Sequence, residues 1–141
     1  MFGWGVGDII AISRLATKVY AAYKDAPKNY QNISEEVKSL EIIIKKTVQH
    51  FNKTTLSDSD WQDCQEILKG CQSVLEDLYS LIEKYNSLAS ASSSQVVKRV
   101  GLGTEDIATL RDRLISNTGL LNSFIHRFDI SNYLLLMGIL Y

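Results

Sequence analysis

The sequence contains little proline, little cysteine and no excess of charge of either sign. Of its 141 residues, one is proline and two are cysteine, and the formal net charge is -1. The scarcity of proline leaves long helices uninterrupted. Proteins that bind nucleic acid typically carry a strong excess of Lys and Arg. This chain has no such excess, so we expect no nucleic-acid partner.

The two cysteines, Cys64 and Cys71, are seven residues apart on an expected helix. At 1.5 Å of rise per residue they are separated by roughly 10 Å, which is too far for a mutual disulfide. We interpret them as two small core residues of a protein from a reducing compartment, which favours the cytoplasm.

Catalytic and metal-binding sets are also lacking. His50 and His126 stand alone on different expected helices. Gly3, Gly5 and Gly7 alternate, but no strand precedes them and no Gly-Lys-Ser follows, so a phosphate-binding loop is not indicated. We therefore predict a protein that is not an enzyme and has no catalytic residues, no metal and no cofactor.

Helical periodicity is what the sequence does contain. No strand-like alternation of any length occurs, whereas four stretches carry apolar residues at helical spacing. A chain of this length suits one domain. The fold class is therefore all-α, and we predict an up-and-down four-helix bundle over residues 1–129.

The boundaries of the first two helices depend on Pro27. The first helix is expected over residues 8–25, because Asp8 suits a cap or first turn and Pro27 blocks continuation. The second is expected to begin between residues 27 and 34 and to end near Phe51. Its apolar stripe is widened by Ile42 and Ile43, which indicates contact with more than one neighbour.

The clearest heptad in the sequence predicts the third helix. Ser59 and Gln62 match a capping box, and the pattern indicates a helix of about 28 residues in a bundle. Its apolar positions are Trp61, Cys64, Leu68, Cys71, Leu75, Leu78, Ile82 and Tyr85. A serine-rich loop is expected over residues 87–103, and a fourth helix from Thr104.

Residues 130–141 form an apolar tail, too short to span a bilayer of roughly 30 Å as a helix by itself. It either extends the fourth helix, forms a short fifth helix, or is the cut edge of a longer protein.

The N-terminal segment is the main functional candidate. Neither a basic start nor a clear cleavage site marks it as a signal peptide, so we expect it to be retained. It is either the first helix of the core or a helix that leaves the bundle to meet a membrane or a partner. The residues expected to meet membrane are Phe2, Trp4, Val6, Ile9, Ile10 and Ile12.

A thin polar stripe runs along the same helix and consists of Asp8, Arg14 and Lys18. These charges disfavour a lone transmembrane helix, but a ring of helices around a wet pore would tolerate them. Ile9 and Ile12 are expected to meet lipid early, and Ile9 is expected to lie near the helix end, close to solvent.

Five segments carry a family resemblance: VGDIIA at 6–11, AYKDAP at 22–27, ISEEVKSL at 33–40, DIATLRDRL at 106–114 and LLNSF at 120–124. With these segments, residues 2–128 resemble the fungal N-terminal domain of STAND proteins, the HeLo-like domain of fungal NOD-like receptors. The pieces are helix patterns rather than a catalytic signature. The chain departs from the family in lacking a nucleotide-binding module and in its apolar tail.

The resemblance implies a non-enzymatic cell-death effector of innate immunity and heterokaryon incompatibility. Such a domain would self-associate, move from the cytoplasm to the plasma membrane, and target or permeabilise anionic lipid through its N-terminal helix. In the full-length family context a nucleotide-binding module is expected to follow it. The alternative is a protein–protein adaptor module that recruits a downstream partner without membrane insertion.

Overall fold

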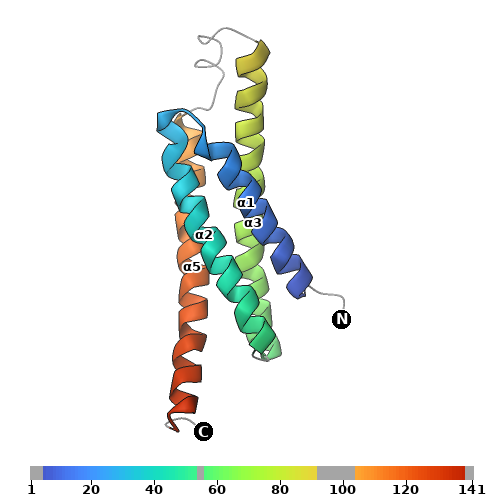
Figure 1. The fold of residues 1–141 in the computed structure, drawn as a ribbon, viewed down its shortest axis with the longest axis vertical. Coiled ribbons are helices and arrows are strands. Elements are labelled where there is room, and N and C mark those ends of the chain that lie inside the picture. The colour runs from blue at the N-terminus through green and yellow to red at the C-terminus, as the bar shows by residue number, and fades with distance from the viewer. Residues whose placement is uncertain (1–4, 54–55, 92–103, 139–141) are drawn as a thin grey trace.

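The computed structural model describes residues 5–53, 56–91 and 104–138. These residues form the helices α1 (Val6–Lys24), α2 (Lys28–Lys53), α3 (Asp58–Ala91) and α5 (Thr104–Leu136). Successive helices run in opposite directions along the long axis of the molecule (Figure 1). The prediction of an all-α, up-and-down four-helix bundle is confirmed.

The four helices pack as two hairpins laid against each other. In the described part of the chain, α1 packs on α2 and α3, and α5 packs on the same two helices. The ring order is therefore α1–α2–α5–α3, and the connection from α2 to α3 crosses the bundle diagonally. One layer consists of α1 and α2, and the opposite layer consists of α3 and α5 (Figure 1).

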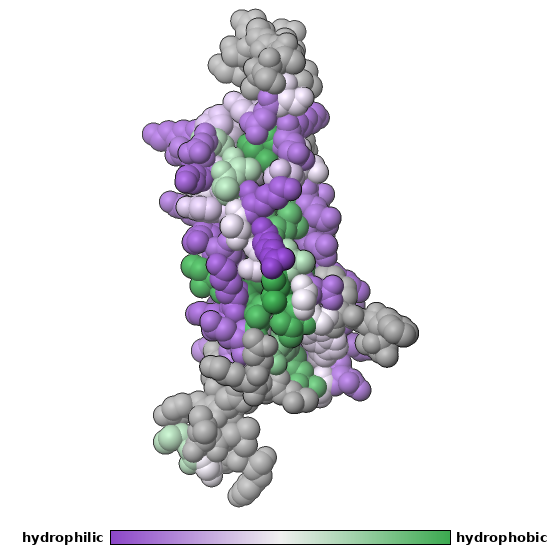
Figure 2. Space-filling model, turned by 45° about the vertical axis from the view of Figure 1, so that its right-hand side comes forward, coloured by the Kyte–Doolittle hydropathy of each residue, from purple (hydrophilic) through white to green (hydrophobic). Residues whose placement is uncertain are grey.

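The core follows the predicted helical stripes, because residues three and four apart share one face of a helix. On α3, the heptad positions from Cys64 to Ile82 are buried, whereas Trp61 and Tyr85 are half-buried. The other helices contribute Ile9, Ile12, Ala16, Val19, Tyr23, Ile33, Val37, Leu40, Ile44, Leu110, Leu114, Leu121, Phe124 and Ile125. The outer surface is mostly polar, with hydrophobic side chains gathered in the lower half of one face (Figure 2).

Two helix starts differ from the prediction by about half a turn. Helix α1 begins at Val6, and the carboxylate of Asp8 accepts a 2.6 Å hydrogen bond from the N–H of Gly5, the residue before the helix. Helix α3 begins at Asp58, and its cap is Ser57, whose hydroxyl accepts the N–H of Asp60 at 3.2 Å. The predicted cap at Ser59 was therefore wrong, because the equivalent Ser57–Asp60 pair lies two residues earlier.

The end of α3 differs from the expected boundary, whereas the end of α5 matches one expected alternative, in which the tail extends the fourth helix. Helix α3 continues to Ala91, so residues 87–91 are helical rather than part of the loop. The rest of the expected loop lies outside the described residues. Helix α5 continues to Leu136, so residues 130–136 lie in the same helix as the residues before them.

The apolar face of α2 is narrower than predicted. The side chain of Ile42 is 47% exposed and that of Ile43 is half-buried, so Ile42 does not widen the core contact. Midway along α5, the polar side chain of Asn117 lies against Gly70 of α3 and donates a 2.8 Å hydrogen bond to the carbonyl of Arg113.

Candidate functional site

Helix α1 places the predicted membrane residues on different sides. Ile9 is 0% exposed and Ile12 is 3% exposed, and both belong to the bundle core. Ile10 is 36% exposed, and Val6 is half-buried. Phe2 and Trp4 lie outside the described residues. With α1 packed in the bundle, therefore, Ile10 faces solvent, and Ile9 and Ile12 face the core.

The expectation that Ile9 lies close to solvent was wrong. Helix α1 begins at Val6, so Ile9 already lies in its first full turn and faces α2 and α3 with the rest of the apolar stripe. A charge at this position would destabilise the bundle itself, because an ionised group would be buried without a partner. Ile10 is the better position for testing membrane contact.

The predicted polar stripe of α1 lies on the outer surface. Asp8, Arg14 and Lys18 are all exposed. Asp8 caps its own helix, as described above, whereas the ammonium of Lys18 lies 4.3 Å from the ring centroid of Tyr79 on α3. A cation over an aromatic face is attracted to it. Lys18 thus contributes to holding α1 on α3.

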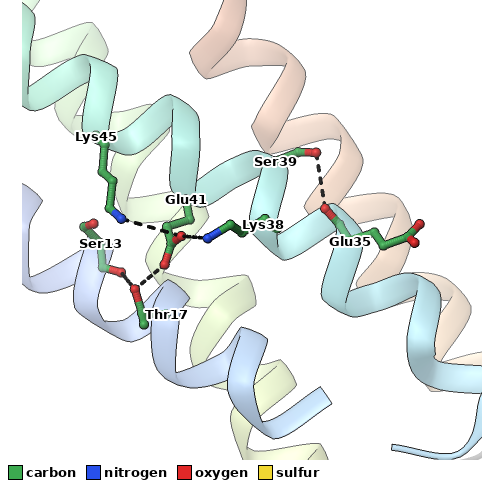
Figure 3. Close-up of polar contacts among 7 residues, drawn as sticks. All are labelled: Ser13, Thr17, Glu35, Lys38, Ser39, Glu41 and Lys45. Atoms are coloured by element: carbon green, nitrogen blue, oxygen red, sulfur yellow. Dashed lines mark hydrogen bonds and ion pairs between the residues drawn. The ribbon is translucent and has the colours of Figure 1, made fainter. Parts of the chain in front are cut away.

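A cluster of polar side chains joins α1 to α2 (Figure 3). It consists of Thr17 on α1 with Lys38, Glu41 and Lys45 on α2, and we call it the Glu41 cluster. The carboxylate of Glu41 accepts hydrogen bonds from the Thr17 hydroxyl and, at 2.8 Å, from Lys38. Lys45 lies 3.7 Å from the same carboxylate. The side chain of Glu41 is 2% exposed, whereas the two lysines are 48% and 59% exposed.

The electrostatics of the Glu41 cluster favour the ionised carboxylate. Burial raises the pKa of Glu41, but hydrogen bonds from Lys38 and Thr17 and the charges of the two lysines together bring that pKa below its ordinary value of 4.5. The Thr17 hydroxyl also lies 3.1 Å from the Ser13 carbonyl of its own helix. An alternative acceptor is therefore present on α1 if the carboxylate is withdrawn.

A second polar contact joins α1 to α3 near its C-terminal end. The hydroxyl of Tyr23, on a fully buried side chain, donates a 2.6 Å hydrogen bond to the carbonyl of Leu78. Burial, with a smaller contribution from Tyr30, raises the pKa of Tyr23 well above its usual value. The hydroxyl therefore stays protonated and remains a donor.

Sequence reasoning missed the Glu41 cluster. Glu41 lies four residues after Val37 and three before Ile44, and both of these neighbours are buried. A carboxylate at such a core-facing position was the signal that could have found it. Its lysine partners stand three residues before it and four after it, which is the spacing of helical ion pairs.

Other potential sites are shallow or absent among the described residues. A groove of about 490 Å³ lies between α3 and α5. No group of three or more histidine, cysteine or acidic side chains in the described ranges is arranged to hold a metal ion. None of the helices, as far as they are described, combines the length and hydrophobicity that crossing a bilayer requires.

Comparison with known proteins gives no family assignment: no family model, no curated protein and no solved structure matches this chain.

Proposed function

We propose that this chain is a non-enzymatic cell-death effector domain of the fungal NOD-like receptor type. It acts by self-association and by targeting or permeabilising membrane through α1. The proposal joins the family resemblance of residues 2–128 to the way α1 is attached to the bundle. Anionic lipids are the membrane partner, and the chain relocates from the cytoplasm to the plasma membrane on activation.

The observation that carries the proposal is the polar attachment of α1. On the α2 side the attachment includes a buried carboxylate, and on the α3 side it includes the Tyr23 hydroxyl and the Lys18 ammonium. Water can replace each of these contacts when the helix leaves, so their loss costs less than their number suggests. Residues 25–27 form the short link to α2, and only this link has to bend.

The dimensions and charges of α1 suit an oligomer better than a lone span. Its 19 residues give a helix of about 28 Å, close to the hydrocarbon thickness of roughly 30 Å. Arg14 and Lys18 would be costly in lipid unless they line water. Several copies around an aqueous pore would keep these charges hydrated and would turn Ile9 and Ile12 outward to lipid.

The proposal predicts that an aspartate at Ile10 abolishes dye release from anionic liposomes. Ile10 lies in the N-terminal half of α1, which enters lipid first, so a charge there has to pass through hydrocarbon. On insertion scales that costs up to roughly 2.5–3.5 kcal/mol per copy, and an oligomer multiplies the cost. Ile10 is partly exposed in the docked state, so Ile10→Asp should leave the bundle folded. Circular dichroism and thermal unfolding check the fold.

Ala21→Asp is the matched control. Ala21 is exposed and lies about 20° from Ile10 around the helix axis, at the opposite end of α1. A helix that enters lipid from its N-terminal end leaves position 21 near the interface, so Ala21→Asp should release dye like the parent. Equal release by the parent and by folded Ile10→Asp would contradict membrane entry. Cell killing by a folded Ile10→Asp chain that releases no dye would instead favour the adaptor function.

A further inference from the structure

Charge is divided unequally between the two layers of the bundle. Residues 6–53, which contain α1 and α2, carry eight Lys and Arg against five Asp and Glu, a net charge of +3. Helices α3 and α5 together carry five Lys and Arg against eleven Asp and Glu, a net charge of -6. The near-neutral total therefore hides one cationic and one anionic layer on opposite sides of the molecule.

An exposed isoleucine stands at the centre of the cationic side of α2. Ile42 is 47% exposed and is preceded by Lys38 at four residues and followed by Lys45 and Lys46 at three and four residues. These spacings place all four side chains on one face of the helix. We call this surface, Ile42 with Lys38, Lys45 and Lys46, the Ile42 patch.

The anionic layer contains a groove of complementary character between α3 and α5. Its apolar lining is Ile67, Leu120 and Phe124, and Leu120 is 53% exposed. Asp63 and Glu66 supply its acidic edge on α3. The other lining residues are Ser123 and Arg127, and the Arg127 guanidinium lies 5.2 Å from the Phe124 ring centroid.

We infer that the Ile42 patch of one copy docks in the α3–α5 groove of a second copy. Ile42 would enter the apolar groove, and Lys45 and Lys46 would face Asp63 and Glu66. An anionic membrane would account for the lysines alone, whereas a second copy accounts for both the lysines and the acidic groove. This inference rests on the self-association in the proposed function.

The contact is heterologous, because it joins two different surfaces on opposite layers. A pair then has one unused groove on one copy and one unused patch on the other, so the assembly grows until a ring closes or a filament forms. Attraction between the two charged layers is screened by salt, so association should strengthen as ionic strength falls.

The test is sedimentation of the full 141-residue chain at low ionic strength without lipid. Ile42→Asp removes the patch, and Leu120→Asp removes the groove. Each variant alone should weaken self-association at least about tenfold. Ile115→Asp is the control, because Ile115 is 50% exposed on α5 but does not line the groove. It should associate like the parent.

Mixing the two defective variants gives the decisive result. The Leu120→Asp chain keeps its patch and the Ile42→Asp chain keeps its groove, so an equimolar mixture should form a dimer that does not grow. A mixture that remains monomeric, while the parent associates, would overturn the inference. A parent chain that stays monomeric up to about 1 mM would also overturn the inference. This holds even if Lys46→Glu abolishes binding to anionic vesicles, because the lysines would then serve a membrane alone. Dye release is measured separately, so the sedimentation result neither supports nor contradicts the membrane proposal.

Discussion

At the scale of the residue, Glu41 is a buried carboxylate whose cationic partners remain in solvent. Removing one member of a buried ion pair is usually destabilising because it leaves the other charge buried and unpaired. That does not apply here, since Lys38 and Lys45 are about half exposed and Thr17 has a second acceptor on its own helix. Glu41 can therefore be replaced without leaving a buried unpaired charge. The contribution of Glu41 to the attachment of α1 can then be measured without that complication.

Gly70 is the second informative residue, because α3 and α5 approach closely there. A Cβ atom at Gly70 would lie 2.4 Å from Oδ1 of Asn117, whereas a Cβ at Gly119 on α5 would meet nothing within 4 Å. Asn117 is held by its hydrogen bond to the Arg113 carbonyl, so it gives way only by losing that bond.

These two glycines predict opposite effects of the same substitution. Replacing an exposed helical glycine by alanine gains about 0.5–1 kcal/mol, so Gly119→Ala should stabilise the bundle. Gly70→Ala should instead lower the free energy of unfolding by about 1 kcal/mol, because overpacking outweighs the gain in helix propensity. Urea unfolding measures both. Equal stabilisation by the two variants would show that the helices are not in close contact at Gly70.

At the scale of the element, docking of α1 should weaken in acid. The pKa of Glu41 is lowered in the folded state, so its contribution to stability is complete above the ordinary pKa of 4.5 and is lost as the pH falls through the folded value. Protonation weakens the hydrogen bond from Thr17 to Glu41, which ties α1 to α2. The amide-exchange protection of α1, relative to α3, should therefore fall as the pH is lowered from 7 to below 4.5.

Glu41→Gln isolates this effect from the other carboxylates. The variant should show the weaker protection of α1 already at pH 7, and its ratio of α1 to α3 protection should change little with pH. If parent and variant lose α1 protection in parallel on acidification, the pH dependence does not come from Glu41.

Most of the elements could be predicted from the sequence because apolar residues at helical spacing report burial directly. The heptad of α3 located the central core residues of that helix. The exact cap of α3 could not be predicted, since Ser57–Asp60 and Ser59–Gln62 satisfy the same pattern. The exposure of Ile42 was missed because periodicity does not say how many neighbours a helix has.

The candidate site was less predictable than the fold. Sequence pattern placed Ile9, Ile10 and Ile12 on one short segment, but only the packing of α1 separates the buried pair from the exposed Ile10. The Glu41 cluster depends on a contact between helices, Thr17 to Glu41, which single-helix patterns do not contain.

At the scale of the whole molecule, the order of the helices favours departure of α1. A short link joins it to α2, so bending at that link is enough to separate α1 from α3 (Figure 1). The α2–α5 and α3–α5 contacts remain in its absence, and ion pairs such as Glu36–Arg111 and Asp77–Arg113 join those helices. In the proposed function, therefore, α1 moves while α2, α3 and α5 remain as a three-helix scaffold.

The most direct measurement is of membrane permeabilisation by a chain in which α1 is cross-linked to α3. Lys18→Cys and Tyr79→Cys replace a contacting pair and leave the Glu41 cluster intact. A short bis-methanethiosulfonate cross-linker, which reductant cleaves, would join them. The native Cys64 and Cys71 should not react, because they are buried and burial raises the pKa of each thiol to about 12.

Dye release from anionic liposomes is then compared before and after reduction, with each single-cysteine variant carried through the same treatment as a control. The proposed function predicts that the cross-linked chain releases no dye. Once the cross-link is cleaved, release should reach the level of the single-cysteine controls. Release by the cross-linked chain as fast as by the reduced chain would contradict the proposed function, because α1 would then not need to leave the bundle.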